Sequence, residues 1–191
     1  MGNITGDFVG NSANGDGGAI SNVDQIGDIT GNFIGNHAGG YGGAIFNGLY
    51  GDVEIGNITG DFIGNYVKST DYGDSAGGAI YNEQGEIGDI TGDFTLNSAN
   101  GYQASGGAIA NMAYSVVEAF IAPEPEQSSY IGNIAGDFIG NKAVSEYEAK
   151  GGAVYNEARM GNITGDFIEN KAVGEYEAKG GAVYNLSLIH I

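Results

Sequence analysis

The chain has 191 residues, and its 24 acidic and six basic side chains give a formal net charge of −18. This charge disfavours nucleic acids, anionic lipid surfaces and polyuronates, which need compensating Lys or Arg, whereas cations and basic partners are compatible with it. The 37 glycines follow no three-residue period, which excludes collagen, and the lack of cysteine excludes disulfides and thiol chemistry.

One two-part motif recurs six times along the chain. Its first half resembles Ile-Gly-Asn-Ile-Thr-Gly-Asp-Phe-x-x-Asn and is centred on Phe8, Phe33, Phe62, Phe94, Phe138 and Phe167. Its second half, Gly-Gly-Ala-(Ile/Val)-x-Asn, begins at Gly17, Gly42, Gly77, Gly106, Gly151 and Gly180. A period of a few tens of residues indicates that small, similar units are stacked.

Each unit contains segments that are too short and too rich in Gly and Ile for helices. Residues 55–59, 61–65 and 77–82, with their equivalents, are typical of short strands broken by Gly and Asn. The repeat therefore predicts an all-β parallel β-helix, or β-solenoid, of about six coils with variable loops. Neighbouring coils are expected about 4.8 Å apart. A bundle of amphipathic helices is the competing, less favoured architecture.

The repeated positions also predict columns of like side chains. Alternation along the strands predicts that the Phe33, Ile29 and Ile45 columns point inward. The Asn36 and Asn47 columns are expected in left-handed or bridging conformations, with amides hydrogen-bonded from coil to coil. The Gly-Gly pair is expected to allow a turn with positive φ.

Two connections in each unit vary in length, which favours solvent-facing loops. The first connection has five to 11 residues and the second three to 19. Core strands cannot change length in this way, whereas loops can at little entropic cost. The longest connection, within Met112–Tyr130, contains Pro123 and Pro125 and is expected to project as an exposed loop or arm.

Acidic residues form the first candidate site, because five aspartates share one repeat position: Asp7, Asp61, Asp93, Asp137 and Asp166. Carboxylates about 4.8 Å apart repel by roughly 1 kcal/mol in water, so they are either solvated or bridged by cations. We favour solvation, because calcium requires six to eight converging oxygen ligands.

An enzymatic site receives less support. A uronate lyase needs a basic residue beside the substrate, and the only arginine, Arg159, lies in a short connector. A glycoside hydrolase needs a unique pair of carboxylates, whereas the acidic residues here recur or lie in expected loops such as that of Glu146. His37 is interpreted as a solvated turn residue, and His190 lies in a non-repeat tail. The sequence therefore assigns no catalytic, cofactor-binding or metal-binding residues.

Tyrosines are candidates for recognition. Tyr81, Tyr155, Tyr184 and Phe46 share one position of the second motif half, where they either contact partners or cover coil edges. A second set is expected to be exposed on loops, which suits protein or glycan recognition; it comprises Tyr41, Tyr66, Tyr72, Tyr102, Tyr147 and Tyr176.

The paired Phe-x-x-Asn and Gly-Gly-Ala-(Ile/Val) motifs resemble the repeats of polymorphic outer-membrane proteins and related autotransporter adhesins. The matching positions are Phe8, Asn11 and residues 17–20, with their five sets of equivalents, while Val9 and Gly10 are free positions. The resemblance implies a right-handed β-helical passenger that is exported to the cell surface, remains there or is secreted, and mediates adhesion. It also implies a C-terminal membrane barrel in the full-length protein.

We expect residues 1–185 to be a β-helix region from a longer passenger, because Met1 occupies a position inside the first repeat. The tail, residues 186–191, matches no repeat; it resembles a translated sequencing adapter, and a capping strand is the alternative. The favoured function is a non-enzymatic stalk whose loops attach to a protein or glycan on a host or neighbouring cell. The alternatives are a carbohydrate-active β-helix enzyme, either polysaccharide lyase or hydrolase, and a cation-stabilised structural solenoid.

Overall fold

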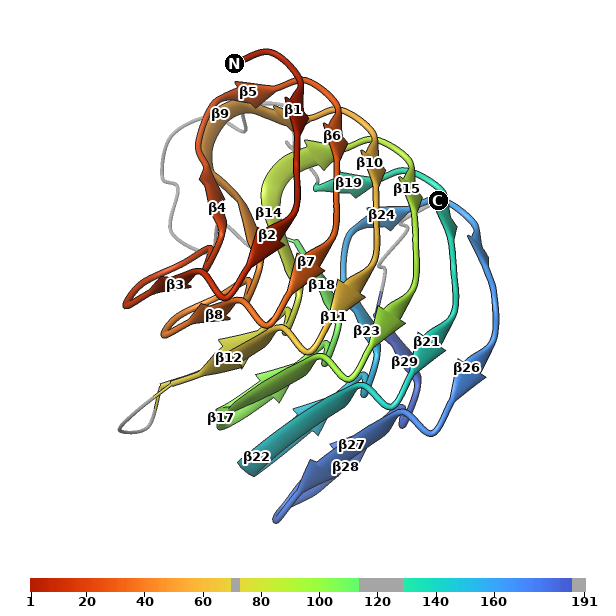
Figure 1. The fold of residues 1–191 in the computed structure, drawn as a ribbon. Coiled ribbons are helices and arrows are strands. Elements are labelled where there is room, and N and C mark those ends of the chain that lie inside the picture. The colour runs from red at the N-terminus through yellow and green to blue at the C-terminus, as the bar shows by residue number, and fades with distance from the viewer. Residues whose placement is uncertain (70–72, 114–128, 187–191) are drawn as a thin grey trace, which may run out of the picture.

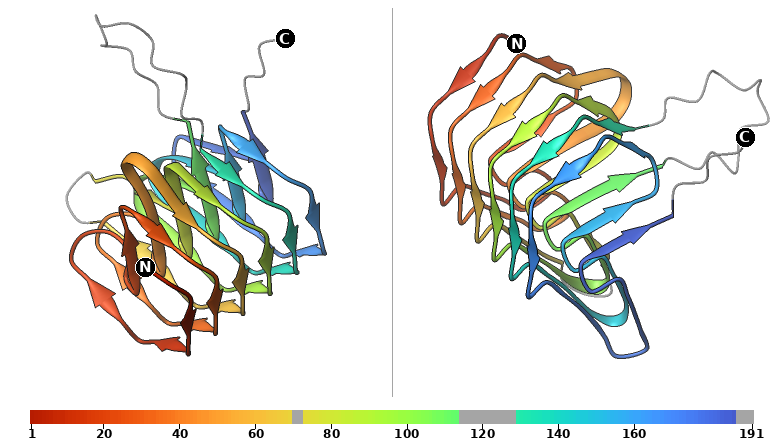
Figure 2. Two further views of the ribbon diagram at one scale, coloured as in Figure 1. Left: turned by 90° about the horizontal axis from the view of Figure 1, so that it is seen from above. Right: turned by 90° about the vertical axis from the view of Figure 1, so that its right-hand side faces the viewer.

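The chain winds as a stack of coils whose strands form four parallel sheets (Figure 1). This computed structural model describes residues 1–69, 73–113 and 129–186, and every strand pairing in it is parallel. Figure 2 shows the coils following one another from the N-terminal to the C-terminal end. The predicted all-β solenoid of about six coils is confirmed, and the described residues contain no helix. We number the coils 1 to 6 by their motif phenylalanines.

The first motif half forms two sheets of two-residue strands. Sheet A carries the Ile-Thr pairs in β1 (Ile4–Thr5), β6 (Ile29–Thr30), β10 (Ile58–Thr59), β15 (Ile90–Thr91), β20 (Ile134–Ala135) and β25 (Ile163–Thr164). Sheet B carries the phenylalanines in β2 (Phe8–Val9), β7 (Phe33–Ile34), β11 (Phe62–Ile63), β16 (Phe94–Thr95), β21 (Phe138–Ile139) and β26 (Phe167–Ile168). In both sheets each residue pairs with its motif equivalent.

Sheet D contains the second motif half and the connector that follows it. Its strands are β4 (Ile20–Asn22), β5 (Gln25–Ile26), β9 (Ile45–Ile55), β14 (Ile80–Ile87), β18 (Ile109–Met112), β19 (Tyr130–Ile131), β23 (Val154–Asn156), β24 (Arg159–Met160) and β29 (Val183–Asn185). Within β9 and β14 the connector itself is strand, and the three extra residues of coil 2 are absorbed by a register shift between Glu83 and Gly85.

Sheet C is formed by the connection between Phe-x-x-Asn and Gly-Gly-Ala. Its strands are β3 (Ser12–Ala13), β8 (His37–Ala38), β12 (Tyr66–Lys68), β13 (Ser75–Ala76), β17 (Ser98–Ser105), β22 (Lys142–Lys150), β27 (Lys171–Gly174) and β28 (Glu177–Lys179). The prediction that this connection is a solvent-facing loop is wrong, because β17 and β22 run through it and pair in register.

We call this connection the fin, because in each coil the chain runs outward from the stacked strands of the other three sheets and then returns to them. The outgoing strand β12 and the returning strand β13 both pair with β17, and alanines of the two legs share one buried cluster. The fin of coil 5 is one residue longer than that of coil 4, and a register shift between Gly101 and Gln103 absorbs the difference. Length therefore varies at the tip while the legs remain paired.

The interior of the coils is filled by the predicted columns. Ile29, Phe33 and Ile45 are fully buried, as predicted. The six phenylalanine rings stack with centroids 4.6–4.8 Å apart and planes within 3° of parallel. Burial of apolar rings and their mutual stacking both stabilise the coil, so a phenylalanine in each repeat is required by the repeats on either side.

The roles of glycine and asparagine agree only in part with those that the sequence predicts. The first Gly of each Gly-Gly-Ala has positive φ, as predicted, whereas the second allows close approach: a Cβ at Gly78 would overlap the carbonyl oxygen of Gly107. The motif asparagines are not left-handed. Instead, the residue before the first asparagine has a φ of 54–64°, at Gly10, Gly35, Gly64, Leu96, Gly140 and Glu169. Position 10 and its equivalents are therefore not free.

The long insertion of coil 4 was predicted to be an exposed arm. Its residues 114–128 lie outside the described residues, as do Tyr72 and His190.

Candidate functional site

Two columns of buried asparagine amides connect the coils. The Asn36 backbone N–H and Nδ2 both donate to Asn65 Oδ1, at 3.0 and 2.8 Å, and Asn65 Nδ2 donates to Asn97 Oδ1 and to the Phe33 carbonyl oxygen. In the second column, Asn47 Nδ2 donates to Asn82 Oδ1 at 2.8 Å. The predicted coil-to-coil amide bonding is confirmed. Because these amides are buried and paired, they hold the coils in register and are not available to a ligand.

The acidic column is partly or fully exposed to solvent, and its carboxylates also accept hydrogen bonds from the backbone. The backbone N–H of Asp93 donates to Asp61 Oδ1 at 2.9 Å, and the N–H of Asp137 donates to Asp93 Oδ1 at 2.8 Å. The same bond continues to Asp166. One oxygen of each inner carboxylate thus accepts a hydrogen bond from a backbone N–H group, which offsets part of the repulsion between coils. We call these residues the aspartate ladder.

A second polar column was missed in the sequence, although its repeat position was available. Asn3, Asp28, Asn57, Asp89, Asn133 and Asn162 are linked by bonds from each backbone N–H to the side-chain oxygen in the previous coil. Asn and Asp alternate up to Asn133, so no two carboxylates are neighbours in this column. Repulsion between stacked carboxylates is therefore limited differently in the two columns. In the aspartate ladder it is offset by bonds to backbone N–H groups, and in the second column neighbouring carboxylates are avoided.

The tips of the fins carry an exposed tyrosine column. Tyr102 stacks on Tyr147 with centroids 5.6 Å apart, and Tyr147 stacks on Tyr176 at 5.0 Å. Tyr147 is 40% exposed and Tyr176 78% exposed. Nearer the base of the fin, the His37 ring stacks on Tyr66, which is also exposed.

Charged side chains accompany these tyrosines. Lys150 Nζ lies 2.8 Å from Glu148 Oε2, and Lys179 Nζ lies 2.9 Å from Glu177 Oε1 and 3.6 Å from Glu148 Oε1. The Lys150 ammonium lowers the pKa of the Glu148 carboxyl, against the opposing effect of burial. The fins of coils 5 and 6 therefore present aromatic and charged groups together.

The tyrosines of the second motif half lie elsewhere. Phe46, Tyr81 and Tyr155 are almost fully buried and form an outer aromatic cluster with Tyr41 and Tyr184. Burial raises the pKa of the Tyr81 and Tyr155 phenols, and it also raises the pKa of the Glu83 carboxyl beside Tyr81. This set covers the outer side of sheet D, while Tyr66, Tyr147 and Tyr176 are exposed, as predicted.

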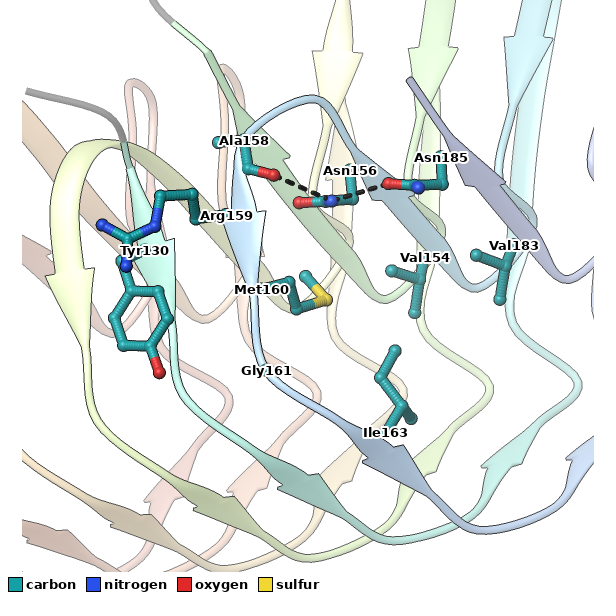
Figure 3. A pocket seen from close by; sticks show the side chains of 10 residues that line it. All are labelled: Tyr130, Val154, Asn156, Ala158, Arg159, Met160, Gly161, Ile163, Val183 and Asn185. Atoms are coloured by element: carbon teal, nitrogen blue, oxygen red, sulfur yellow. Dashed lines mark hydrogen bonds between the residues drawn. The ribbon is translucent and has the colours of Figure 1, made fainter. Parts of the chain in front are cut away.

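An open recess of about 640 Å³ lies at the last coil (Figure 3). It is lined by core residues of coils 5 and 6, including Val154, Met160, Ile163 and Val183. Asn156 Nδ2 donates to Ala158 O at 3.1 Å and to Asn185 Oδ1 at 2.7 Å. The recess is thus the repeating interior seen from the end of the stack, and its polar groups belong to the asparagine ladder.

The described residues include no group of three or more His, Cys, Asp or Glu side chains arranged to hold a metal ion. In residues 1–69, 73–113 and 129–186, no helix has the length and apolar character needed to cross a membrane.

Comparison with known families gives a match to the Chlamydia polymorphic membrane protein repeat over residues 6–23. Those residues contain the first Phe-x-x-Asn and the first Gly-Gly-Ala-Ile of the chain. No curated protein and no solved structure gives a significant match. The matched motif recurs in all six coils and forms their stacked columns. The predicted resemblance is therefore confirmed at the level of the repeat: the matched unit and the β-solenoid fold fit a repeat protein of the polymorphic outer-membrane or autotransporter type.

Proposed function

We propose that this chain is part of a non-enzymatic, surface-exposed attachment protein. The solenoid acts as a rigid spacer, and the fins form the contact surface. The name of the matched repeat family suggests a membrane-associated location, and an autotransporter-like passenger is compatible with both the repeat and the fold. Repetition of similar fins along one rod would add avidity to weak individual contacts.

The tyrosine column of the fin tips is the observation that carries this proposal. Tyr147 and Tyr176 are large, rigid side chains at the ends of paired strands, far from the interior that fixes the fold. Aromatic residues are enriched in protein recognition surfaces because they bury much area at little entropic cost. Since the fins vary in length while the core does not, recognition could change without loss of the fold.

The geometry of the column favours a protein partner over a glycan. Sugars bind aromatic side chains mainly through the ring faces, but the faces of Tyr147 are taken up by Tyr102 and Tyr176. The exposed parts of Tyr147 are therefore its ring edge and phenolic hydroxyl group, and Glu146 and Glu175 directly precede Tyr147 and Tyr176 in the chain. Such a surface suits hydrogen bonds and basic side chains of a protein.

The recurrent carboxylates support a structural role over catalysis. The inner members of the aspartate ladder each bind a backbone amide of the next coil, and this bond repeats with the coil. A glycosidase requires a unique pair of carboxylates on either side of its substrate. We therefore propose that the acidic residues maintain the solenoid and its surface charge.

Attachment of beads coated with the chain to epithelial and bacterial cells would test this proposal. We expect a Tyr147→Ser/Tyr176→Ser variant to bind at least tenfold fewer cells, and protease treatment of the cells to reduce binding more than glycosidase treatment. Val23→Ser is the control, because Val23 is a 54% exposed apolar residue outside the fins. Binding of the double variant at the level of the unmodified chain would contradict the role of the fin tips.

A further inference from the structure

The outer face of sheet B carries a second surface, which the attachment function does not use. The residue after each phenylalanine is half-buried or exposed, whereas the phenylalanines of coils 2 to 5 are fully buried, so it points outward. It pairs with its equivalents along the whole stack of sheet B (Figure 1). We call this set the aliphatic column; it consists of Val9, Ile34, Ile63, Thr95, Ile139 and Ile168. Val9, Ile63 and Ile168 are 60%, 37% and 44% exposed. Isolated exposed apolar residues are common, but apolar residues at five of six successive positions in a column indicate a contact surface.

Coil 4 provides an independent observation. There the column has the polar Thr95, and the next residue is Leu96, where coils 1, 2, 3 and 5 have glycine. Leu96 has a φ of 57° and is 63% exposed, so a bulky side chain is held in a left-handed conformation without being buried. Burial does not compensate for this strain. The leucine maintains an exposed apolar group at the one coil whose column position is polar, which indicates function at this surface.

The two flanks of the column differ in charge. The aspartate ladder lies two residues before it along the chain in every coil except coil 2, which has Asn32, and alternation puts both columns on the outward face. Asp7, Asp93 and Asp166 are exposed. The Oδ2 atoms of these three carboxylates accept no hydrogen bond from the described residues. On the other side lies the largely glycine column of Gly10 and its equivalents, which leaves the aliphatic side chains accessible from that flank.

The hydrogen bonding of the sheet B backbone limits which kind of partner can dock on its outer face. Sheet B strands are already paired with the coils before and after them, so the outer face offers no free backbone groups. An extended peptide on this face would leave its own N–H and C=O groups without partners, whereas a helix satisfies them internally. A second copy of this chain would bring two surfaces of the same charge together, at −18 each.

We propose that the aliphatic column and the aspartate ladder form a docking surface for a basic amphipathic helix of a partner protein. Its apolar stripe lies on the column, and Lys or Arg residues along one edge pair with the free aspartate oxygens. The five steps between six coils span about 24 Å at about 4.8 Å each. A helix of about 16 residues covers this length, and its i, i+3 and i+4 side chains recur at a spacing close to that of the coils.

A labelled 18-residue helical peptide of Leu and Lys, with all Leu on one face, is the probe for this surface. Its binding to the 191-residue chain is measured by fluorescence anisotropy at two salt concentrations. We compare it with a scrambled peptide of the same composition and with a Leu/Glu peptide. We expect the amphipathic Lys peptide to bind at least tenfold more tightly than both, with an affinity that falls as salt rises. Equal binding of the scrambled peptide would overturn the proposal, because charge alone would then explain the interaction.

Two variants test whether the peptide binds at the aliphatic column. Ile63→Thr/Ile139→Thr introduces the residue that coil 4 already has, so folding is expected to be retained while affinity falls about tenfold. Leu96→Gly is expected to raise the thermal midpoint yet weaken binding severalfold, an opposite pair of effects that a merely structural leucine would not give. Unchanged affinity in both variants would overturn the proposal.

Two further measurements test whether the fins or self-association account for peptide binding. Tyr147→Ser/Tyr176→Ser is expected to leave peptide affinity unchanged, so failure of the fin proposal and failure of this one are distinguishable. Sedimentation of the chain is expected to show a monomer. A dimer that is lost in Ile63→Thr/Ile139→Thr would assign the column to a second copy and overturn the basic-helix partner.

Discussion

The coil interior and the fins are built from the same repeat but follow different rules. In the interior of coils 2 to 5, each phenylalanine is stacked on the equivalents before and after it, as Phe62 is on Phe33 and Phe94 at 4.7 Å. A change in one coil therefore affects three coils. In the fins, Ala99 and Ala104 fill the space between two legs, and an added residue is absorbed at the tip. Residue identity is thus restricted in the interior, where the columns of side chains are continuous. Segment length can vary at the fin tips, where a turn ends the strand pairing.

Removal of an interior ring should give the largest effect. Phe62→Ala leaves a cavity between two rings and is expected to destabilise the chain by about 4 kcal/mol. Phe167→Ala is the matched control, since Phe167 is 37% exposed and stacks only on Phe138 within the described residues, and we expect less than half of that loss. Urea unfolding followed by circular dichroism measures both. Equal losses would show that stacking on both sides does not matter.

Breaking the asparagine ladder should be the next largest effect. Asn65→Ala removes the acceptor of the Asn36 N–H and Nδ2 groups and the donor to the Phe33 carbonyl. Each buried group without a partner costs about 1–3 kcal/mol, so we expect a loss of about 3 kcal/mol. The exposed Asn100→Ala in the fin is the control and should cost less than about 0.5 kcal/mol. The same urea measurement applies, and a loss below 1 kcal/mol for Asn65→Ala would contradict the ladder's importance.

The sequence was sufficient to predict the interior because its columns consist of like residues at one repeat position. Phe33, Ile29 and the asparagine amides all follow from that rule. The fin was missed because variable length suggests a loop, whereas parallel pairing with the next fin tolerates an extra residue at a bulge. The sequence predicts a left-handed or bridging conformation for asparagine, whereas the left-handed residue is the one before it, and the glycine found there in four of the six motifs was the available signal.

The candidate surfaces were less predictable, because exposure depends on which outward columns other parts of the chain cover. Tyr81 and Tyr147 are similar in sequence context, both near a Gly-Gly-Ala motif, yet only Tyr147 is exposed. Tyr81 is buried in a cluster with Tyr41 of another coil, a contact that no repeat position specifies.

Overfilling the fin should separate it from the core. Ala104→Leu places a large side chain between the legs, with an expected cost of about 2 kcal/mol. We expect hydrogen exchange to accelerate in residues 98–105 and 142–150 while the amides of Phe62 and Phe94 remain protected. Faster exchange throughout the coil would instead show that fin and core unfold as one unit.

Relief of backbone strain should stabilise the chain. Leu96→Gly replaces a left-handed leucine by the residue found at this position in coils 1, 2, 3 and 5, and we expect a gain of about 0.5–1 kcal/mol. The reverse change, Gly64→Leu, introduces the same strain in coil 3 and should destabilise by about 1 kcal/mol. Thermal unfolding of the two variants gives the comparison, and a loss of stability in Leu96→Gly would mean that the leucine supports the fold.

The ion pairs of the fin should give the smallest effect, visible mainly in its pH dependence. Because Lys150 lowers the pKa of Glu148 in the folded chain, this carboxylate stabilises the fold above its unfolded pKa of about 4.3. That contribution is lost as the pH falls through the lower folded pKa. The thermal midpoint of Glu148→Gln should therefore lie slightly below that of the unmodified chain at pH 7. The two midpoints should converge once the pH lies below the lowered folded pKa of Glu148. Glu146 is an exposed neighbour that forms no ion pair with the described residues, so Glu146→Gln should have the midpoint of the unmodified chain at pH 7. A constant offset for Glu148→Gln at all pH values would point to a packing effect instead of charge.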